Sequence, residues 1–515
     1  MRSFRPALVF ALSFAVAPGF VAAQERPAGE DAEAALATDA KPEPVTAVTR
    51  HSVRIDGAVV RYTATAGWLI MTGDDGEPVA RFGYTAYTRD DVEDRNRRPV
   101  TFAFNGGPGS ASAWLHMGIL GPRRVVVTDE GYAPPPPVEL VDNAYSVLDL
   151  TDLVMVDPVG TGFSVPLGEA EGKDFWGVDP DIRSVGAFIK KYVTENGRWG
   201  SPKYILGESY GGIRTAGLVH HLQSRESMNF NGVVLVSPFL NMGSGIDGAQ
   251  IDLPHVLYLP TLAATAWYHG AVADRPERLE DFLAEVERFA YEEYAPALLR
   301  GYTIPEAEKR AVAARLAAFT GTDTEYWMKA DLRVTHPQFL QELMRDEREI
   351  AGRIDSRFIG PATNPLGETM DYDPFFPAVG PAFTAAFMTY LHDELELRTD
   401  FEYRFSGGTS DWNWEHAMPG ARGWATPWAD LRPDLAMAMT MNPGLHVLVQ
   451  QGWYDLATPA LATKHDIAHL DIPPGARDRI RMEFYEAGHM MYLHGPSMRK
   501  FREDLASFIR ETDRL

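Results

Sequence analysis

The sharpest chemical signal in the chain is a serine flanked by glycines. Residues Gly207-Glu208-Ser209-Tyr210-Gly211-Gly212 fit the pattern G-x-S-x-G, directly after an expected strand at 204–206 and before an expected helix at 213–222. In this context the serine lies on a strained turn, where side chains two positions away on either side would clash. The helix N-terminus that follows favours a developing oxyanion. We therefore predict that Ser209 is a nucleophile rather than part of a plain glycine-rich connection.

A nucleophilic serine needs a base, and the base needs a carboxylate that orients it. Asp455 follows an expected strand at 446–449, and His489 follows an expected strand at 480–484. Side chains on loops after parallel strands converge at the carboxyl edge of the sheet, and the chain order serine, aspartate, histidine suits this arrangement. We predict Asp455 as the orienting acid and His489 as the base. His494, five residues further on, is the rival base.

A second glycine cluster, Asn105-Gly106-Gly107-Pro108-Gly109, follows an expected strand at 100–104. An oxyanion hole takes one backbone N–H from the residue after the serine, here Tyr210, and the other from the loop after an early strand. Only glycine lets a backbone approach a substrate this closely. We therefore predict a catalytic role for this loop.

Other motifs in the chain are less informative. His465 and His469 have the spacing of metal ligands on a helix, but nothing nearby completes a site, so solvated or capping roles are favoured. Residues 243–248 match the dinucleotide fingerprint, yet no clear helix follows and position 268 is not acidic. The metalloprotease pattern H-E-x-x-H is absent. We predict neither a cofactor nor a metal site.

Short apolar runs alternate with helical patterns around these motifs. An antiparallel β-region is expected from about residue 52 to 88, with a hairpin turn at Asp56-Gly57. The expected buried strands are 100–104, 153–156, 204–206, 233–236, 446–449 and 480–484, and helical periodicity covers 182–193 and 213–222. Buried strands that alternate with helices predict an α/β fold with a mostly parallel, doubly wound sheet.

The alternation stops between about residues 246 and 430. Amphipathic helical patterns cover 276–299 and 305–319, whereas 358–381 is rich in proline and glycine. A long segment without strand signals between two strands predicts a large, mainly helical cap, inserted over the carboxyl edge of the sheet and shaping the substrate pocket.

The N-terminus has the pattern of an export signal. Arg2 and Arg5 precede an apolar stretch at 7–17, and the small residues 21–23 predict cleavage after about Ala23. The apolar run is well below the roughly 20 residues of a spanning helix, which disfavours a membrane anchor. We expect an exported protein, periplasmic or extracellular.

These observations define five expected segments. They are a signal peptide (1–23), a flexible leader (24–45), the first part of the core (46–245), the cap insertion (246–430) and the second part of the core (431–515).

The composition of the chain limits its partners. Its 515 residues are 45% hydrophobic and 23% charged, as in ordinary globular proteins. A net charge of −23 disfavours nucleic acid and anionic lipid, so we expect neither a nucleic-acid partner nor stable membrane insertion. The complete absence of cysteine excludes a thiol nucleophile, Cys-ligated metals and disulfides. The oligomeric state is left open.

Together the motifs resemble the serine carboxypeptidase family. The segments that carry the resemblance, in family order, are 105–112, 157–164, 207–212, 452–455 and 488–489. The resemblance covers roughly residues 50–245 and 430–515, and it implies an α/β-hydrolase fold. It also implies Ser209 as nucleophile, His489 as base, Asp455 as orienting acid, and an oxyanion hole formed by the backbone N–H groups of Gly107 and Tyr210.

The resemblance further implies that Asn105, Gly106 and Glu208 bind the terminal carboxylate of the substrate. The chemistry of Glu208 supports this role, because a protonated carboxyl group donates a hydrogen bond to a carboxylate that an ionised one would repel. Two residues depart from the family pattern. Ala103 stands where the family usually has Trp, and Ser110 where it has Cys. The first affects packing beneath the carboxylate site, and the second removes a typical disulfide.

We therefore expect a secreted, cofactor-free serine carboxypeptidase that releases C-terminal residues from peptides or proteins through an acyl-enzyme. Two alternatives remain. One is an acyltransferase or esterase on the same scaffold, and the other is a non-catalytic binding module.

Overall fold

The computed structural model describes residues 42–248, 251–408, 411–421 and 424–513. The expected signal peptide and nearly all of the expected leader lie outside the described residues. Within the described part of the chain, every helix falls short of the length and apolarity that crossing a membrane requires.

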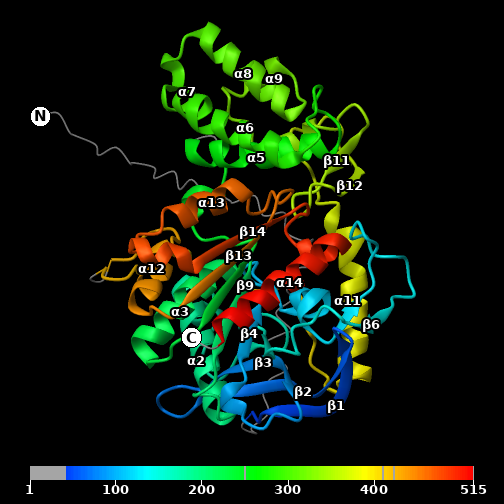
Figure 1. Ribbon diagram of the computed structural model, residues 1–515, viewed down its shortest axis with the longest axis vertical. Helices are drawn as coiled ribbons and strands as arrows, with labels where there is room; N and C mark the ends of the chain where they lie inside the picture. The colour runs from blue at the N-terminus through cyan, green and yellow to red at the C-terminus, as the bar shows by residue number, and fades with distance from the viewer. Residues whose placement is uncertain (1–41, 249–250, 409–410, 422–423, 514–515) are drawn as a thin grey trace, which may run out of the picture. The chain divides into compact units, whose positions relative to one another are not determined.

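A ten-stranded sheet forms the core (Figure 1). Its strand order is β1-β2-β3-β7-β4-β9-β10-β13-β14, and β8 pairs with β3. The strands are β1 (Val45–Ile55), β2 (Ala58–Thr72), β3 (Pro78–Arg89), β4 (Val100–Phe104), β7 (Asp152–Val156), β8 (Val165–Pro166), β9 (Lys203–Glu208), β10 (Gly232–Val236), β13 (His446–Gly452) and β14 (Ile480–Tyr485). The run from β7 to β14 is parallel, so the predicted mostly parallel sheet is confirmed.

The antiparallel part of the sheet begins earlier than the sequence pattern indicated. β1 starts at Val45 rather than near residue 52, because its alternating side chains pair with β2 along the whole strand. The predicted hairpin turn at Asp56-Gly57 joins the two strands, and both residues have positive φ.

Helices cover both faces of the parallel strands, as a doubly wound sheet requires. One face packs against α2 (Val178–Glu195), α3 (Gly211–Glu226) and α12 (Arg432–Met441). The other packs against α11 (Phe375–Asp393) and α14 (Gly495–Thr512). Alternate residues of β4 pack on opposite faces of the sheet. Phe102 lies in the core with α2, α3 and α12, whereas Ala103 lies in the core with α11 and α14.

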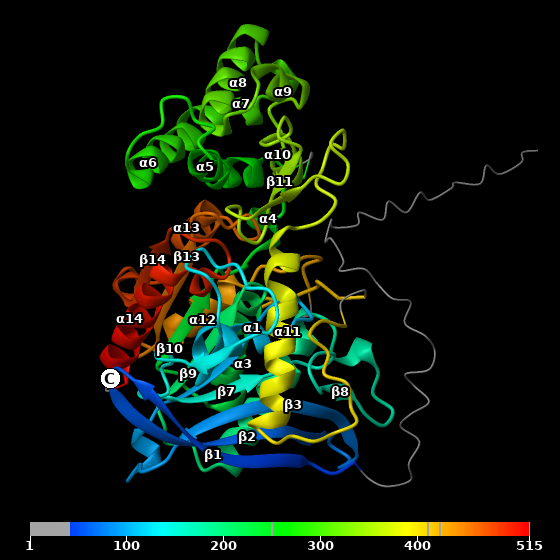
Figure 2. The same ribbon diagram turned by 90° about the vertical axis from the view of Figure 1, so that its right-hand side faces the viewer.

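The long segment between β10 and β13 is mainly helical. Its helices are α4 (Met242–Gly245), α5 (Asp252–Tyr268), α6 (Leu279–Phe289), α7 (Ala295–Leu299), α8 (Glu306–Thr320), α9 (Thr324–Lys329) and α10 (His336–Glu342), followed by a short hairpin of β11 (Glu349–Ala351) and β12 (Ile359–Pro361). The helices from α5 to α10 share a separate hydrophobic core with α13 (Ala460–Ala468). Figures 1 and 2 both show the cluster beyond the ends of β13 and β14.

The last part of the same segment packs differently. α11 begins within the proline- and glycine-rich stretch and lies along the sheet rather than in the helical cluster (Figure 2). Its aromatic side chains explain this position. Phe383 packs on Trp114 with ring centroids 5.0 Å apart, and Tyr390 contacts the Tyr87 hydroxyl at 3.0 Å.

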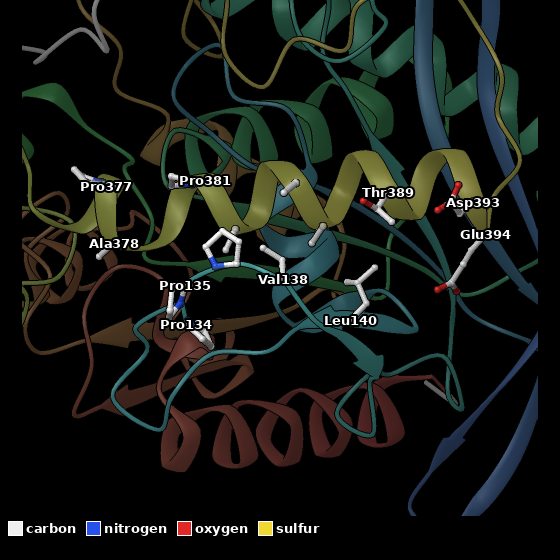
Figure 3. Close-up of a pocket in the computed structure, with 15 residues that line it drawn as sticks. Pro134, Pro135, Val138, Leu140, Pro377, Ala378, Pro381, Thr389, Asp393 and Glu394 are labelled. Carbon is white, nitrogen blue, oxygen red and sulfur yellow. The ribbon is translucent and has the colours of Figure 1, made fainter.

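A cavity of about 590 Å³ lies between α11 and the proline-rich loop at 134–136 (Figure 3). Pro381, Thr389 and Glu394 are among its lining residues. None of the predicted site residues lines this cavity.

Candidate active site

Ser209 lies on the tight turn between β9 and α3. Its φ is +63°, in the left-handed region that residues other than glycine rarely adopt. A Cβ at Gly207 would lie 2.2 Å from the carbonyl oxygen of Gly211, so the first glycine of the motif is sterically required. At Gly211 the nearest contact would be 3.3 Å, to Phe104, which is tight rather than prohibitive. The turn is therefore strained, as the motif indicated.

The turn is held against the end of β10. The backbone N–H of Ser209 donates to the carbonyl of Val236 at 3.0 Å, and Phe239 donates to the carbonyl of Ser209 at 2.9 Å. Between them lies Ser237, with a φ of +43°. These bonds fix the backbone from which the Ser209 side chain projects.

The glycine loop at 105–109 packs directly on this turn. A Cβ at Gly106 would lie 2.5 Å from the backbone nitrogen of Tyr210, so only glycine allows the two segments to meet. Gly107 has a φ of +106°. The backbone N–H groups of Gly107 and Tyr210 lie outside the regular helices and strands. They donate no hydrogen bond to any described residue. Both are therefore available to an oxyanion.

Asp455 and His489 lie on the loops after the neighbouring strands β13 and β14. His489 Nδ1 and Asp455 Oδ2 are 2.8 Å apart, and both side chains are buried. The carboxylate also accepts the N–H groups of Ala457 and Thr458 and the Thr458 hydroxyl, at 2.8, 3.0 and 2.6 Å. This set of donors fixes the orientation of the carboxylate.

The Asp455 carboxylate controls the state of the His489 ring. Burial lowers the pKa of His489, but the charge and hydrogen bond of Asp455 raise it, and the net pKa is above the ordinary value. The bond at Nδ1 leaves Nε2 to exchange a proton with a reacting group. This is the arrangement that a general base requires.

Ser237 connects the turn at Ser209 with the loops that carry Asp455 and His489. Its hydroxyl donates to the carbonyl of His489 at 2.7 Å, and its own carbonyl accepts the Thr458 hydroxyl at 2.9 Å. No sequence motif marks this residue, because a serine directly after a buried strand has no distinctive spacing.

Glu208 forms a buried polar group with Asn105. Asn105 Nδ2 donates to Glu208 Oε1 at 2.8 Å, while Asn105 Oδ1 accepts the N–H of Leu115 at 3.0 Å. Burial raises the pKa of Glu208 to about 7, although His489, Tyr492 and Asn105 partly oppose the shift. The carboxyl group is therefore mostly protonated below that pH.

Tyr492 is a further member of this group that the sequence analysis missed. It lies on the short 3₁₀ turn at Met491–Leu493, shortly after His489. Its hydroxyl interacts with Glu208 and Asn105, but neither this buried hydroxyl nor the buried Glu208 Oε2 forms a well-aligned hydrogen bond with another described residue. A Cβ at Gly118 would lie 2.5 Å from the Tyr492 ring, so this glycine makes room for it. No local motif marks such a long-range fit.

A segment from the insertion also contacts the acid and base loops. We call residues 353–356, between β11 and β12, the cap strap. The backbone N–H of Leu456 donates to the carbonyl of Arg353 at 3.1 Å. The backbone N–H of His489 donates to the carbonyl of Ile354 at 2.7 Å. Gly488 donates to the Asp355 carboxylate at 3.1 Å. The cap strap thus bridges the loops that carry Asp455 and His489.

The rival histidines occupy other positions. His494 precedes α14, where its Nδ1 lies 2.8 Å from the Ser497 hydroxyl, and burial lowers its pKa to about 4. The Nδ1 of His469 lies 2.7 Å from the carbonyl oxygen of His465. Within the described residues, no group of three or more potential ligands gathers to hold a metal ion.

Residues 62–284 match the family model described as serine carboxypeptidase. The predicted resemblance to this family is confirmed. Two serine carboxypeptidase-like proteins of Arabidopsis thaliana, numbers 36 and 9, are 29% and 25% identical to the chain over 171 and 155 residues. The aligned parts cover 32% and 28% of this chain and only 33% of each relative. Ser209 lies inside the matched region, whereas Asp455 and His489 lie outside the family-model match.

The fold is similar to that of KEX1(DELTA)P, a prohormone-processing carboxypeptidase from Saccharomyces cerevisiae. The TM-score is 0.54 at 14% identity, and the alignment covers 87% of this chain and 91% of that one. At this identity the likeness concerns the fold alone, and the predicted α/β-hydrolase fold is confirmed.

The substitution Gly207→Ala tests whether the turn at Ser209 is as tight as described. The added methyl would overlap the Gly211 carbonyl at 2.2 Å, so we expect a loss of about 2 kcal/mol in the free energy of unfolding. Urea unfolding measures the loss. Gly475→Ala is the matched control, because its Cβ would meet nothing within 4 Å. Equal stability of the two variants would contradict the steric argument.

Proposed function

We propose that the protein is a serine carboxypeptidase that hydrolyses C-terminal peptide bonds through an acyl-enzyme on Ser209. The observation that carries this proposal is the Glu208–Asn105 group directly beside the nucleophile turn. A general esterase needs a nucleophile, an acid and a base, but it has no need for a buried, protonated carboxyl group next to the serine. Such a group is suited to binding the terminal carboxylate of a peptide.

The proposed reaction begins when His489 Nε2 accepts the proton of the Ser209 hydroxyl. The oxygen attacks the last peptide carbonyl, and the N–H groups of Gly107 and Tyr210 stabilise the oxyanion. Asp455 stabilises the imidazolium that forms. The peptide C–N bond then breaks, and His489 returns the proton to the leaving amine.

Water completes the cycle. His489 accepts a proton from the water that attacks the acyl-enzyme, and the proton returns to Ser209 as the shortened peptide leaves. The expected substrates are therefore peptide or protein C-termini.

Recognition of the terminal carboxylate is proposed to use Glu208, Asn105, Gly106 and Tyr492. Asn105 occupies Glu208 Oε1, so the proton of the carboxyl group belongs on Oε2, which has no partner. A protonated Oε2 and the Tyr492 hydroxyl then supply two donors, and the backbone N–H of Gly106 supplies a third. Charge-assisted hydrogen bonds of this kind are among the stronger ones in proteins.

Two further parts of the proposal concern export and the role of the insertion. The N-terminal signal pattern supports export, to the periplasm or the medium. The helical cluster from α5 to α10 supports a cap role for the insertion, since it contacts the acid loop through its shared core with Trp453 and Tyr454.

The first test compares an N-blocked dipeptide with its C-terminal amide. We expect kcat/KM about 100-fold higher for the free acid, because the amide loses the charge-assisted hydrogen bonds. Ser209→Ala should abolish hydrolysis and covalent labelling by a fluorophosphonate, while Ser52→Ala, at an exposed position, should change neither. Equal rates for acid and amide would instead indicate an esterase, endopeptidase or acyltransferase.

The second test follows from the pKa of Glu208. Since burial raises it to about 7, the group is neutral below pH 7 and charged above it, where it repels the substrate carboxylate. KM for acid-terminated peptides should therefore rise as pH increases from 6 to 8, up to about tenfold per unit above pH 7.

Two matched controls belong to this titration. Glu208→Gln keeps a donor at every pH and should make KM independent of pH over the same range. An amide-terminated substrate should show no such rise in the parent protein. A parallel rise in parent and Glu208→Gln would remove Glu208 from carboxylate recognition.

A further inference from the structure

The cap strap brings a positively charged side chain to the proposed catalytic site. Arg353 is fixed at its backbone on both sides, because its carbonyl accepts Leu456 N–H at 3.1 Å and its N–H donates to Asp373 at 3.2 Å. The backbone carbonyl of the next residue, Ile354, accepts a hydrogen bond from the backbone N–H of His489. Arg353 is therefore anchored between the acid loop and the base loop.

The guanidinium group lies within electrostatic range of the reacting base. Its positive charge acts to lower the pKa values of His489, of Tyr258 in α5 and of Asp373. The side chain is neither fully buried nor fully exposed. The backbone bonds of Arg353 and Ile354 place this cation beside the loops that carry Asp455 and His489.

Arg353 has no partner for its charge. Among the described residues, its guanidinium forms neither a hydrogen bond nor an ion pair. The neighbouring Arg357 is the contrast, because the Asp355 carboxylate binds it in a fork at 2.9 and 2.6 Å. A partly desolvated guanidinium is normally paired, so an unpaired one in a site favours an anionic ligand.

The nearby acids do not supply that partner. Three backbone N–H groups occupy the Asp373 carboxylate, those of Arg353, Ile354 and Phe375. Asp247 is paired with His336 at 2.8 Å, and Asp455 is saturated by its own loop and His489. A carboxylate from the substrate is the remaining candidate.

We propose that Arg353 binds the side-chain carboxylate of an acidic residue next to the scissile bond. This makes Arg353 a specificity-determining residue and Asp- or Glu-containing C-termini the preferred substrates. The inference rests on the proposed carboxypeptidase function. The terminal carboxylate itself is assigned to the group around Glu208, which has its own unpartnered donors.

A local cation is needed for such a preference, since the whole chain carries a net charge of −23. This charge repels acidic peptides at long range, although salt screens it beyond about 8 Å at physiological ionic strength. A bidentate contact with Arg353 acts inside that distance and is weakened less by salt.

The experiment compares blocked dipeptides that differ only in one carboxylate. One pair carries Glu or Gln as the C-terminal residue, and the other carries Glu or Gln as the penultimate residue. In the parent protein we expect kcat/KM to favour Glu about 10- to 100-fold in at least one pair. The two pairs distinguish which residue contacts Arg353.

Variants of Arg353 then test the assignment. Arg353→Gln should bring the Glu-to-Gln ratio close to one, Arg353→Lys should keep part of it, and Arg353→Glu should favour Gln over Glu. Because each ratio is measured within one preparation, a partly unfolded variant still gives a valid result. Arg499→Gln, at an exposed position outside the site, is the matched control and should leave the ratio unchanged.

The outcomes separate this inference from the proposed function. No hydrolysis of any dipeptide by the parent protein would reject the carboxypeptidase proposal itself. Hydrolysis with a ratio that Arg353→Gln leaves unchanged would overturn the inference alone. An equal loss of rate on Glu and Gln peptides would also overturn it, because Arg353 would then bind the terminal carboxylate or only support the loops.

Discussion

The buried hydrogen bond between Asp455 and His489 is the contact on which the candidate site depends. It requires two loops from neighbouring parallel strands to touch, and a Cβ at Gly452 would lie 2.2 Å from the Gly488 carbonyl. Four donors orient the carboxylate, so the imidazole is fixed in one tautomer. Ser237 then joins this pair to the turn that carries Ser209.

The two halves of the site come from different parts of the chain. The region that matches the family model carries the nucleophile turn and the glycine loop, whereas the acid and base follow the insertion. The cap strap contacts both later loops, so the insertion also positions Asp455 and His489. A change in the cap strap therefore alters the surroundings of His489 directly.

Sequence patterns predicted those elements whose conformation depends on residues that are close together in the chain. The buried strand at 100–104 has the predicted bounds, because an apolar run that ends at a glycine loop has few other conformations. The tight turn at Ser209 followed from its glycines in the same way. Tyr492, Ser237 and Arg353 could not be found, since each matters only through contacts with segments distant in sequence. The position of α11 on the sheet likewise depends on aromatic packing that no periodicity indicates.

A C-terminal ladder assay tests the central claim most directly. A mixture of peptides is incubated with the protein between pH 4 and 8, and the products are identified by mass spectrometry. We predict stepwise loss of single residues from free C-termini, with amidated peptides left intact and no products from Ser209→Ala. Internal cleavage, or equal trimming of amidated peptides, would contradict it.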